Sequence, residues 1–166
     1  MIENGADMDI SMYNGYKLLH HATNNLKEDM VEFLLEKGVN AKAEDDAGNN
    51  SLHIASFKGV LSVVNRLVEA GIDVNSTNNA NQTPLHKASN LGHISIVKTL
   101  LKCGANIDSV DKEGNSPLVR IIFSDHRTLV VYFKAYIYIL DPYKFPYIYH
   151  IIKNLCTNIY ASYSIT

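Results

Sequence analysis

Three histidines, His20, His53 and His86, are the side chains whose type and spacing most resemble a set of metal ligands. Consecutive members lie 33 positions apart. Imidazole nitrogen binds Zn²⁺ at about 2.0–2.1 Å, so two ligands of one ion lie only about 3–4 Å apart. Equivalent side chains of stacked helical units are separated by the helix-packing distance of roughly 8–10 Å. The spacing therefore argues against a shared metal ion and favours a structural role for each histidine.

Other residue types that could do chemistry do not fall into a catalytic or ligand-binding pattern. Ser89, Ser95 and Cys103 lie at positions expected on helices, and the chain has no Gly-x-Ser-x-Gly elbow. The glycines lack the spacing of a phosphate-binding loop. The acidic cluster at 44–46 lacks the glycine and the distal glutamate of a calcium loop. We interpret it as a solvated turn, with a partner contact as the alternative, and we expect no catalytic residue, metal or cofactor.

The elements that carry these residues repeat along the chain. Residues 81–105 read as a turn, a short helix, a glycine-containing turn, a second helix and a terminating glycine. The terminating glycine recurs every 33 positions, at Gly5, Gly38, Gly71 and Gly104. Neither helix could bury its apolar face alone. A fixed period of this length indicates a solenoid, in which neighbouring units supply each other's core.

The best-formed unit contains Thr-Pro-Leu-His-Lys-Ala at 83–88 and Gly-Ala-Asn at 104–106, and a second good copy begins Ser-Leu-His-Ile-Ala at 51–55. These motifs closely resemble the ankyrin repeat, well over about 1–118 and weakly over 119–141. The resemblance implies an all-α ankyrin-repeat solenoid of stacked helix-turn-helix units with projecting turns, a partial first repeat and a degenerate C-terminal cap. It also implies that the three histidines hydrogen-bond turns of their own or the adjacent repeat, which suits a side chain that both donates and accepts.

The register of the repeat divides the chain into segments. We expect the tail end of a truncated repeat at 1–11, ankyrin repeats 1, 2 and 3 at 12–44, 45–78 and 79–111, a degenerate repeat 4 at 112–141 and an irregular C-terminal cap or tail at 142–166. The truncated start favours a fragment of a longer protein, or a gene product shortened at its front. For the last segment a poorly ordered tail and a membrane or partner contact are the alternatives to a cap.

Two positions in this register are unusual. Asn81 stands where Gly48 and Gly114 stand in the neighbouring turns, and because Asn tolerates positive φ better than other side chains, we expect it to keep the turn. Leu26 replaces the glycine between the two helices, which predicts a looser or shifted turn in the first repeat.

Composition and charge exclude several classes of function. The net charge of −2 predicts no general affinity for nucleic acid. Cys103 and Cys156 lack metal spacing, and we expect reduced thiols, with a disulfide as the alternative. Reduced thiols fit a cytoplasmic protein, or one in a host cytosol if the source is an intracellular parasite or virus. The start of the chain lacks the basic and apolar features of a signal peptide. The apolar stretch at 129–140 is too short to span a membrane, which needs about 20 residues.

What remains is a surface that binds another molecule. In the ankyrin family, partners contact the turn tips and the exposed positions of the first helices, which together line a concave groove. Phe57 is the sharpest candidate, since exposed aromatic residues are frequent hot spots; packing against Leu91 of the next repeat is its alternative role. Carried over position by position, the expected partner-binding residues are Asp45, Asp46, Asn49, Ile54, Phe57, Lys58, Asn78, Asn79, Gln82, Lys87, Asn90, Leu91, Lys112, Glu113 and Arg120.

We therefore expect a non-enzymatic, monomeric ankyrin-repeat module that binds a partner protein through its concave groove and turn tips. The alternative is a regulatory or targeting fragment of a longer ankyrin-containing enzyme or membrane protein. An enzyme in its own right finds no support in the residues.

Overall fold

The computed structural model describes residues 10–123, and within this range all regular secondary structure is helical. A short 3₁₀ turn, η1 (Tyr13–Gly15), precedes the first helix. The α-helices are α1 (Leu18–Asn24), α2 (Glu28–Glu36), α3 (Ser51–Lys58), α4 (Leu61–Glu69), α5 (Pro84–Asn90), α6 (Ile94–Lys102) and α7 (Pro117–Phe123).

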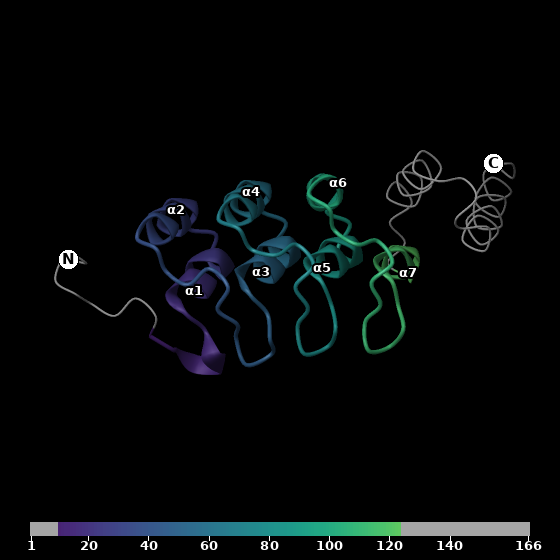
Figure 1. The fold of residues 1–166 in the computed structure, drawn as a ribbon, viewed down its shortest axis with the longest axis horizontal. Coiled ribbons are helices and arrows are strands. Elements are labelled where there is room, and N and C mark those ends of the chain that lie inside the picture. The colour runs from purple at the N-terminus through teal and green to yellow at the C-terminus, as the bar shows by residue number, and fades with distance from the viewer. Residues whose placement is uncertain (1–9, 124–166) are drawn as a thin grey trace, which may run out of the picture.

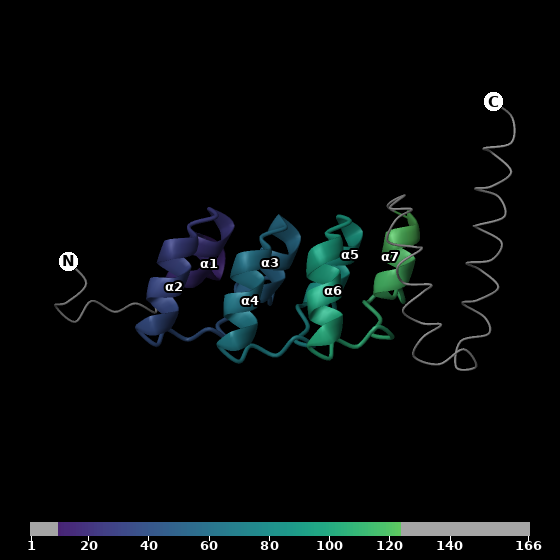
Figure 2. The same ribbon diagram turned by 90° about the horizontal axis from the view of Figure 1, so that it is seen from above.

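The helices stack in two parallel rows (Figure 1). The first helix of each repeat forms one row, in which α1 contacts α3, α3 contacts α5 and α5 contacts α7. The second helices form the other row, where α4 contacts both α2 and α6. Each repeat is therefore one helix-turn-helix layer of a rod, as the view from above shows (Figure 2). The expectation of an all-α ankyrin-repeat solenoid is confirmed for the described residues.

Local sequence chemistry determines where the first helices begin. Thr83 precedes α5 in an extended conformation, and its side-chain oxygen accepts a hydrogen bond from the backbone N–H of His86. Pro84 occupies the first helical position, where its fixed φ and missing N–H carry no penalty. Asn50 has the same capping role before α3, because its side chain accepts from the backbone N–H groups of Leu52 and His53. Such a cap stabilises a helix by about 1 kcal/mol.

The core lies between the two rows and runs along the rod. It repeats the same side chains in successive layers: Leu52 and Leu67 in one repeat correspond to Leu85 and Leu100 in the next, and all four are fully buried. Burial of a leucine side chain stabilises the fold by about 2 kcal/mol relative to exposure. Because these residues meet neighbours from the adjacent repeat, each layer depends on the next one for its core.

The turns project from the first row as a series of hairpin-like tips (Figure 1). Asn81 adopts φ +61°, in the same left-handed region as Gly48 at +75° and Gly114 at +77°. The prediction that Asn81 keeps the turn is confirmed. Consecutive tips are joined by one backbone hydrogen bond at each junction, with N···O distances of 3.0 Å in all three: Asp46 to Asn14, Asn79 to Ala47 and Lys112 to Ala80.

The turn at Leu26 corrects an expectation. Leu26 adopts φ +58°, close to the conformation of Gly59 and Gly92. The hydrogen bond that closes the turn, from the N–H of Lys27 to the oxygen of Ala22, is 2.9 Å long. The prediction of a looser or shifted turn is thus wrong, because packing of the two helices imposes the glycine conformation on a leucine. That conformation costs a non-glycine residue about 1–2 kcal/mol.

Several expectations fall outside the described residues. These are the tail end of a truncated repeat, apart from its last two residues, the second helix of the degenerate fourth repeat and the irregular segment at 142–166.

Candidate functional site

The three regularly spaced histidines are bonded at both ring nitrogens. Nδ1 accepts from the backbone N–H three residues earlier, at 3.0 Å in His20, 3.4 Å in His53 and 3.1 Å in His86. Nε2 donates to a carbonyl oxygen of a later turn, at distances of 2.9, 2.9 and 3.1 Å, and the acceptors are Ala43, Gln82 and Asn115. The prediction that the histidines hold the turns is confirmed.

The electrostatics of these imidazoles follow from their position. All three side chains are buried. Burial lowers the pKa of His53 to about 4 and also lowers the pKa of His20 and His86, although hydrogen bonds to carbonyl oxygens oppose the shift. The rings are therefore neutral at pH 7. Within residues 10–123, no group of three His, Cys, Asp or Glu side chains is arranged to hold a metal ion.

Each helix that the structure describes is too short or too polar to cross a bilayer.

A small cavity opens between the first helices of repeats one, two and three. Its volume is about 230 Å³, and it is lined by Tyr16, Asn24, Asn49, His53, Ile54, Phe57, Lys58 and Lys87. Five of these residues belong to the expected partner-binding set. The other three, Tyr16, Asn24 and His53, do not belong to that set.

Phe57 contributes the exposed apolar side chain of this cavity. It is 48% exposed, on the last turn of α3, and Leu91 of the next repeat is 37% exposed. The backbone oxygen of Phe57 accepts a hydrogen bond of 3.1 Å from Nε2 of His93, which fixes this end of α3 against the following repeat. A half-exposed phenylalanine on a fixed backbone is available to an incoming side chain.

Two residues of the expected set are more buried than anticipated. Ile54 is 7% exposed, so it forms the floor of the cavity and is not a protruding contact. Asn78 is 8% exposed because its oxygen accepts from the N–H groups of Ala80 and Gln82, and its amide donates to Asn49 at 2.8 Å. Asn78 therefore shapes the tip of its repeat.

The basic residues of the first helices differ in how they are neutralised. Arg120 forms ion pairs with Asp111 and Glu113. Lys87 is half-buried; burial lowers its pKa, while the charge of Asp45 raises it. Among the described residues, neither Lys58 nor Lys87 has a carboxylate within ion-pair distance. The cavity therefore has a positive rim on its α3–α5 side.

The remaining expected residues lie on the tips or on the exposed end of α5. Asp45 accepts from the backbone N–H groups of Ala47 and Asn49 at 2.9 and 2.8 Å, so it stabilises its own turn. Gln82 is half-buried and provides the carbonyl oxygen that His53 contacts. The exposed members are Asp46, Asn79, Asn90, Leu91, Lys112 and Glu113.

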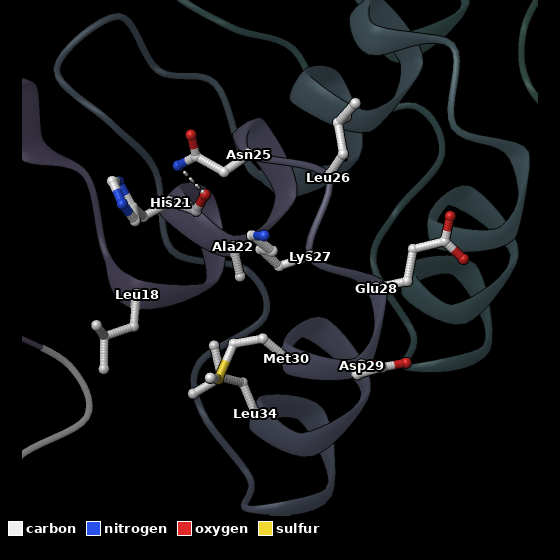
Figure 3. Close-up of a pocket in the computed structure, with 10 residues that line it drawn as sticks. All are labelled: Leu18, His21, Ala22, Asn25, Leu26, Lys27, Glu28, Asp29, Met30 and Leu34. Atoms are coloured by element: carbon white, nitrogen blue, oxygen red, sulfur yellow. Dashed lines mark hydrogen bonds between the residues drawn. The ribbon is translucent and has the colours of Figure 1, made fainter.

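A second hollow lies at the end of the rod, on the side of the first repeat that no described repeat covers. It has a volume of about 1150 Å³, and its lining comes from α1, α2 and the turn between them (Figure 3). Met30 is 45% exposed there, whereas its equivalents Val63 and Ile96 are 2% and 1% exposed beneath a preceding repeat. The repeat pattern alone does not predict this surface, because Met30 is exposed through its place in the first described layer.

The arrangement of stacked helix pairs and projecting tips, with a small cavity between the first helices, defines a helical repeat protein. The family described as ankyrin repeats (3 copies) matches residues 1–78 and again 52–139. The chain belongs to the ankyrin-repeat family. Ankyrin repeats are modules for protein–protein interaction, and members of the family are typically non-enzymatic.

One relative is similar to only part of this chain. Over 62 residues the chain is 39% identical to the B-cell lymphoma 3 protein homolog of Mus musculus. The aligned part makes up 37% of this chain and 14% of that relative. The similarity therefore concerns one segment of a much longer protein.

Proposed function

We propose that this protein binds a partner protein through the groove along α1, α3 and α5, with Phe57 as the central contact, and that it has no enzymatic activity of its own. The observation that supports the proposal is the combination of a half-exposed aromatic ring with two lysines at one small cavity. Aromatic side chains at the centre of an interface are frequent hot spots.

The dimensions of the cavity also support a protein partner. Pockets that hold small molecules or cofactors usually measure roughly 300–1,000 Å³. The cavity at Phe57 measures about 230 Å³, which is room for one large side chain. Helices hold the surrounding residues in place, so binding requires little ordering of the groove, and a larger share of the contact energy appears as affinity.

The partner-binding set is accordingly proposed in two groups. Asn49, Ile54, Phe57, Lys58 and Lys87 line the cavity itself. The residues that extend the contact along the tips and helix ends are Asp45, Asp46, Asn78, Asn79, Gln82, Asn90, Leu91, Lys112, Glu113 and Arg120. We propose that the protein is a cytoplasmic monomer when its groove binds the partner.

Proximity labelling with the wild-type chain, in the cell from which it comes, tests the proposal. The groove variants Phe57→Ala and Lys87→Glu are compared with Asn65→Ala, which alters an exposed residue of α4 in the other row. We expect the groove variants to lose specific partners that Asn65→Ala retains, while circular dichroism shows all three to be folded. Identical partner sets for all variants would remove the groove from consideration.

A further inference from the structure

We propose that the groove recognises an acidic segment of the partner, in which one large apolar side chain enters the cavity at Phe57 and neighbouring carboxylates contact Lys58 and Lys87. This inference rests on the proposed function and specifies the chemistry of the partner.

The apolar part of the proposal follows from the lining of the cavity. Ile54 forms a buried floor and Phe57 a half-exposed wall. A partner side chain placed between them would lose its own contact with water and cover the ring of Phe57. The volume of about 230 Å³ accommodates one such side chain, and offset or edge-to-face contact with the ring favours an aromatic one.

The acidic part of the proposal follows from the distribution of charge. Lys58, Lys87 and Arg120 lie on the first helices, and Arg120 is already paired with Asp111 and Glu113. Lys58 and Lys87 line the cavity, and within residues 10–123 neither forms an ion pair. Because Lys87 is half-buried, its ammonium group has lost part of its hydration. A carboxylate from the partner would restore a favourable environment for that charge.

The acidic tip of the second repeat also influences how the segment lies. The charge of Asp45 acts on Lys87, but its Oδ1 accepts from the backbone of its own turn. With Asp46 exposed beside it, this tip repels a carboxylate. The carboxylates of the segment should therefore lie toward the Lys58 side of the cavity, away from the tip of the second repeat. A basic segment would instead bind at the acidic tip. The sign of the partner's charge therefore distinguishes binding at the cavity from binding at the tip.

The test uses the full chain and three capped peptides of one length, each with a central phenylalanine flanked by two residues on either side. The flanking residues are glutamate in the first peptide, glutamine in the second and lysine in the third. Titrations are followed by ¹H–¹⁵N NMR. We expect the glutamate peptide to bind at least about tenfold more tightly than the glutamine peptide, to lose this advantage at high salt, and to shift the amide signals of Phe57, Lys58 and Lys87.

Variants of the lysines provide the matched controls. The double variant Lys58→Met/Lys87→Met keeps the aliphatic stems and should reduce the affinity for the glutamate peptide to that for the glutamine peptide. Lys102→Met removes an exposed lysine of α6 and should change nothing. Equal binding of the glutamate and glutamine peptides, tighter binding of the lysine peptide, or no binding of any peptide would each overturn the inference.

Failure of the acidic-segment proposal can be distinguished from failure of the proposed function. If proximity labelling finds partners that depend on Phe57 but are retained by Lys58→Met/Lys87→Met, the groove still binds a protein and the acidic partner is wrong. If no partner depends on Phe57, the proposed function itself fails.

Discussion

The side-chain oxygen of Asn50 lies 2.8 Å from Nδ1 of His53, and both atoms are hydrogen-bond acceptors. Nε2 of the ring faces the carbonyl oxygen of Gln82 at 2.9 Å and must carry the proton of the neutral imidazole. The same oxygen of Asn50 accepts from the N–H groups of Leu52 and His53, which fixes the orientation of the amide. Two lone pairs therefore face one another in the interior of the second repeat.

The third repeat shows how this conflict is avoided, and a substitution follows from it. Thr83 occupies the equivalent position, and its hydroxyl lies 2.9 Å from Nδ1 of His86, to which it can donate. Asn50→Thr should raise the free energy of unfolding by about 0.5–1 kcal/mol, although it loses the bond from Asn50 to Ser76. The reverse change, Thr83→Asn, should lower it by a similar amount. Urea denaturation measures both, and a destabilised Asn50→Thr variant would contradict the prediction.

The buried histidines make stability depend on pH. The pKa of His53 is about 4 in the folded chain, below the value of about 6.5 expected when unfolded. Between these values the unfolded chain binds a proton that the folded chain does not. The free energy of unfolding should therefore fall as the pH is lowered from about 6.5 to about 4, by about 3 kcal/mol for His53 alone. His20 and His86 act in the same direction.

Urea titrations at about pH 7 and about pH 4.5 measure this effect. His53→Gln removes one titrating group and should flatten the pH dependence even though it destabilises the repeat. Asp111, whose pKa is lowered despite its burial because the N–H of Asn115 and the Arg120 guanidinium bond it, adds a loss only at more acidic pH. Stability that stays constant between these two pH values would refute the prediction.

Two glycines with the same backbone conformation differ in their surroundings. Gly59 and Gly71 both adopt φ +81°. A Cβ at Gly59 would lie 2.6 Å from Cε1 of His93, whereas one at Gly71 would meet nothing within 4 Å. Gly71→Ala should cost about 1 kcal/mol of backbone strain. Gly59→Ala should cost about 2–3 kcal/mol because it also displaces the ring that bonds Phe57. Thermal denaturation compares the two, and equal losses would rule out the contact with His93.

Asp111 stabilises its own turn and also forms an ion pair with Arg120. Two substitutions distinguish these two contributions to stability. Its oxygen accepts from the N–H groups of Glu113 and Asn115, as Asn78 does in the preceding repeat. Asp111→Asn should keep these bonds, weaken the contact with Arg120 and cost about 1 kcal/mol. Asp111→Ala should cost about 2–3 kcal/mol, because it removes the acceptor of both partly buried N–H groups as well as the ion pair with Arg120. If both variants unfold at the same urea concentration, the turn bonds contribute nothing measurable.

The sequence was sufficient to predict features that depend on the repeat itself. The spacing of the glycines and histidines placed the helix pairs, and Asn81 was recognised as a turn residue from its position alone. The turn at Leu26 differs from its prediction, because the packing of two helices imposes the backbone conformation of this leucine against its own preference.

The groove was predicted less completely than the fold, because it depends on contacts between repeats. Ile54 occupies an exposed type of position, yet it becomes the floor of a cavity once α5 is stacked against α3. The pairing of Arg120 with Asp111 crosses nine positions and is absent from the earlier repeats. The exposed Met30 reflects its place in the first described layer. None of these features is contained in the pattern of a single repeat.

The hydrogen bonds that join one repeat to the next connect residues between 29 and 36 positions apart, as the bonds of His53 and His93 illustrate. Within residues 10–123, each of these bonds joins neighbouring repeats. If the two ends of the protein are pulled apart, each junction between neighbouring repeats would therefore bear the full force. The repeats should therefore unfold one at a time. The repeats that remain stacked would keep their part of the groove intact.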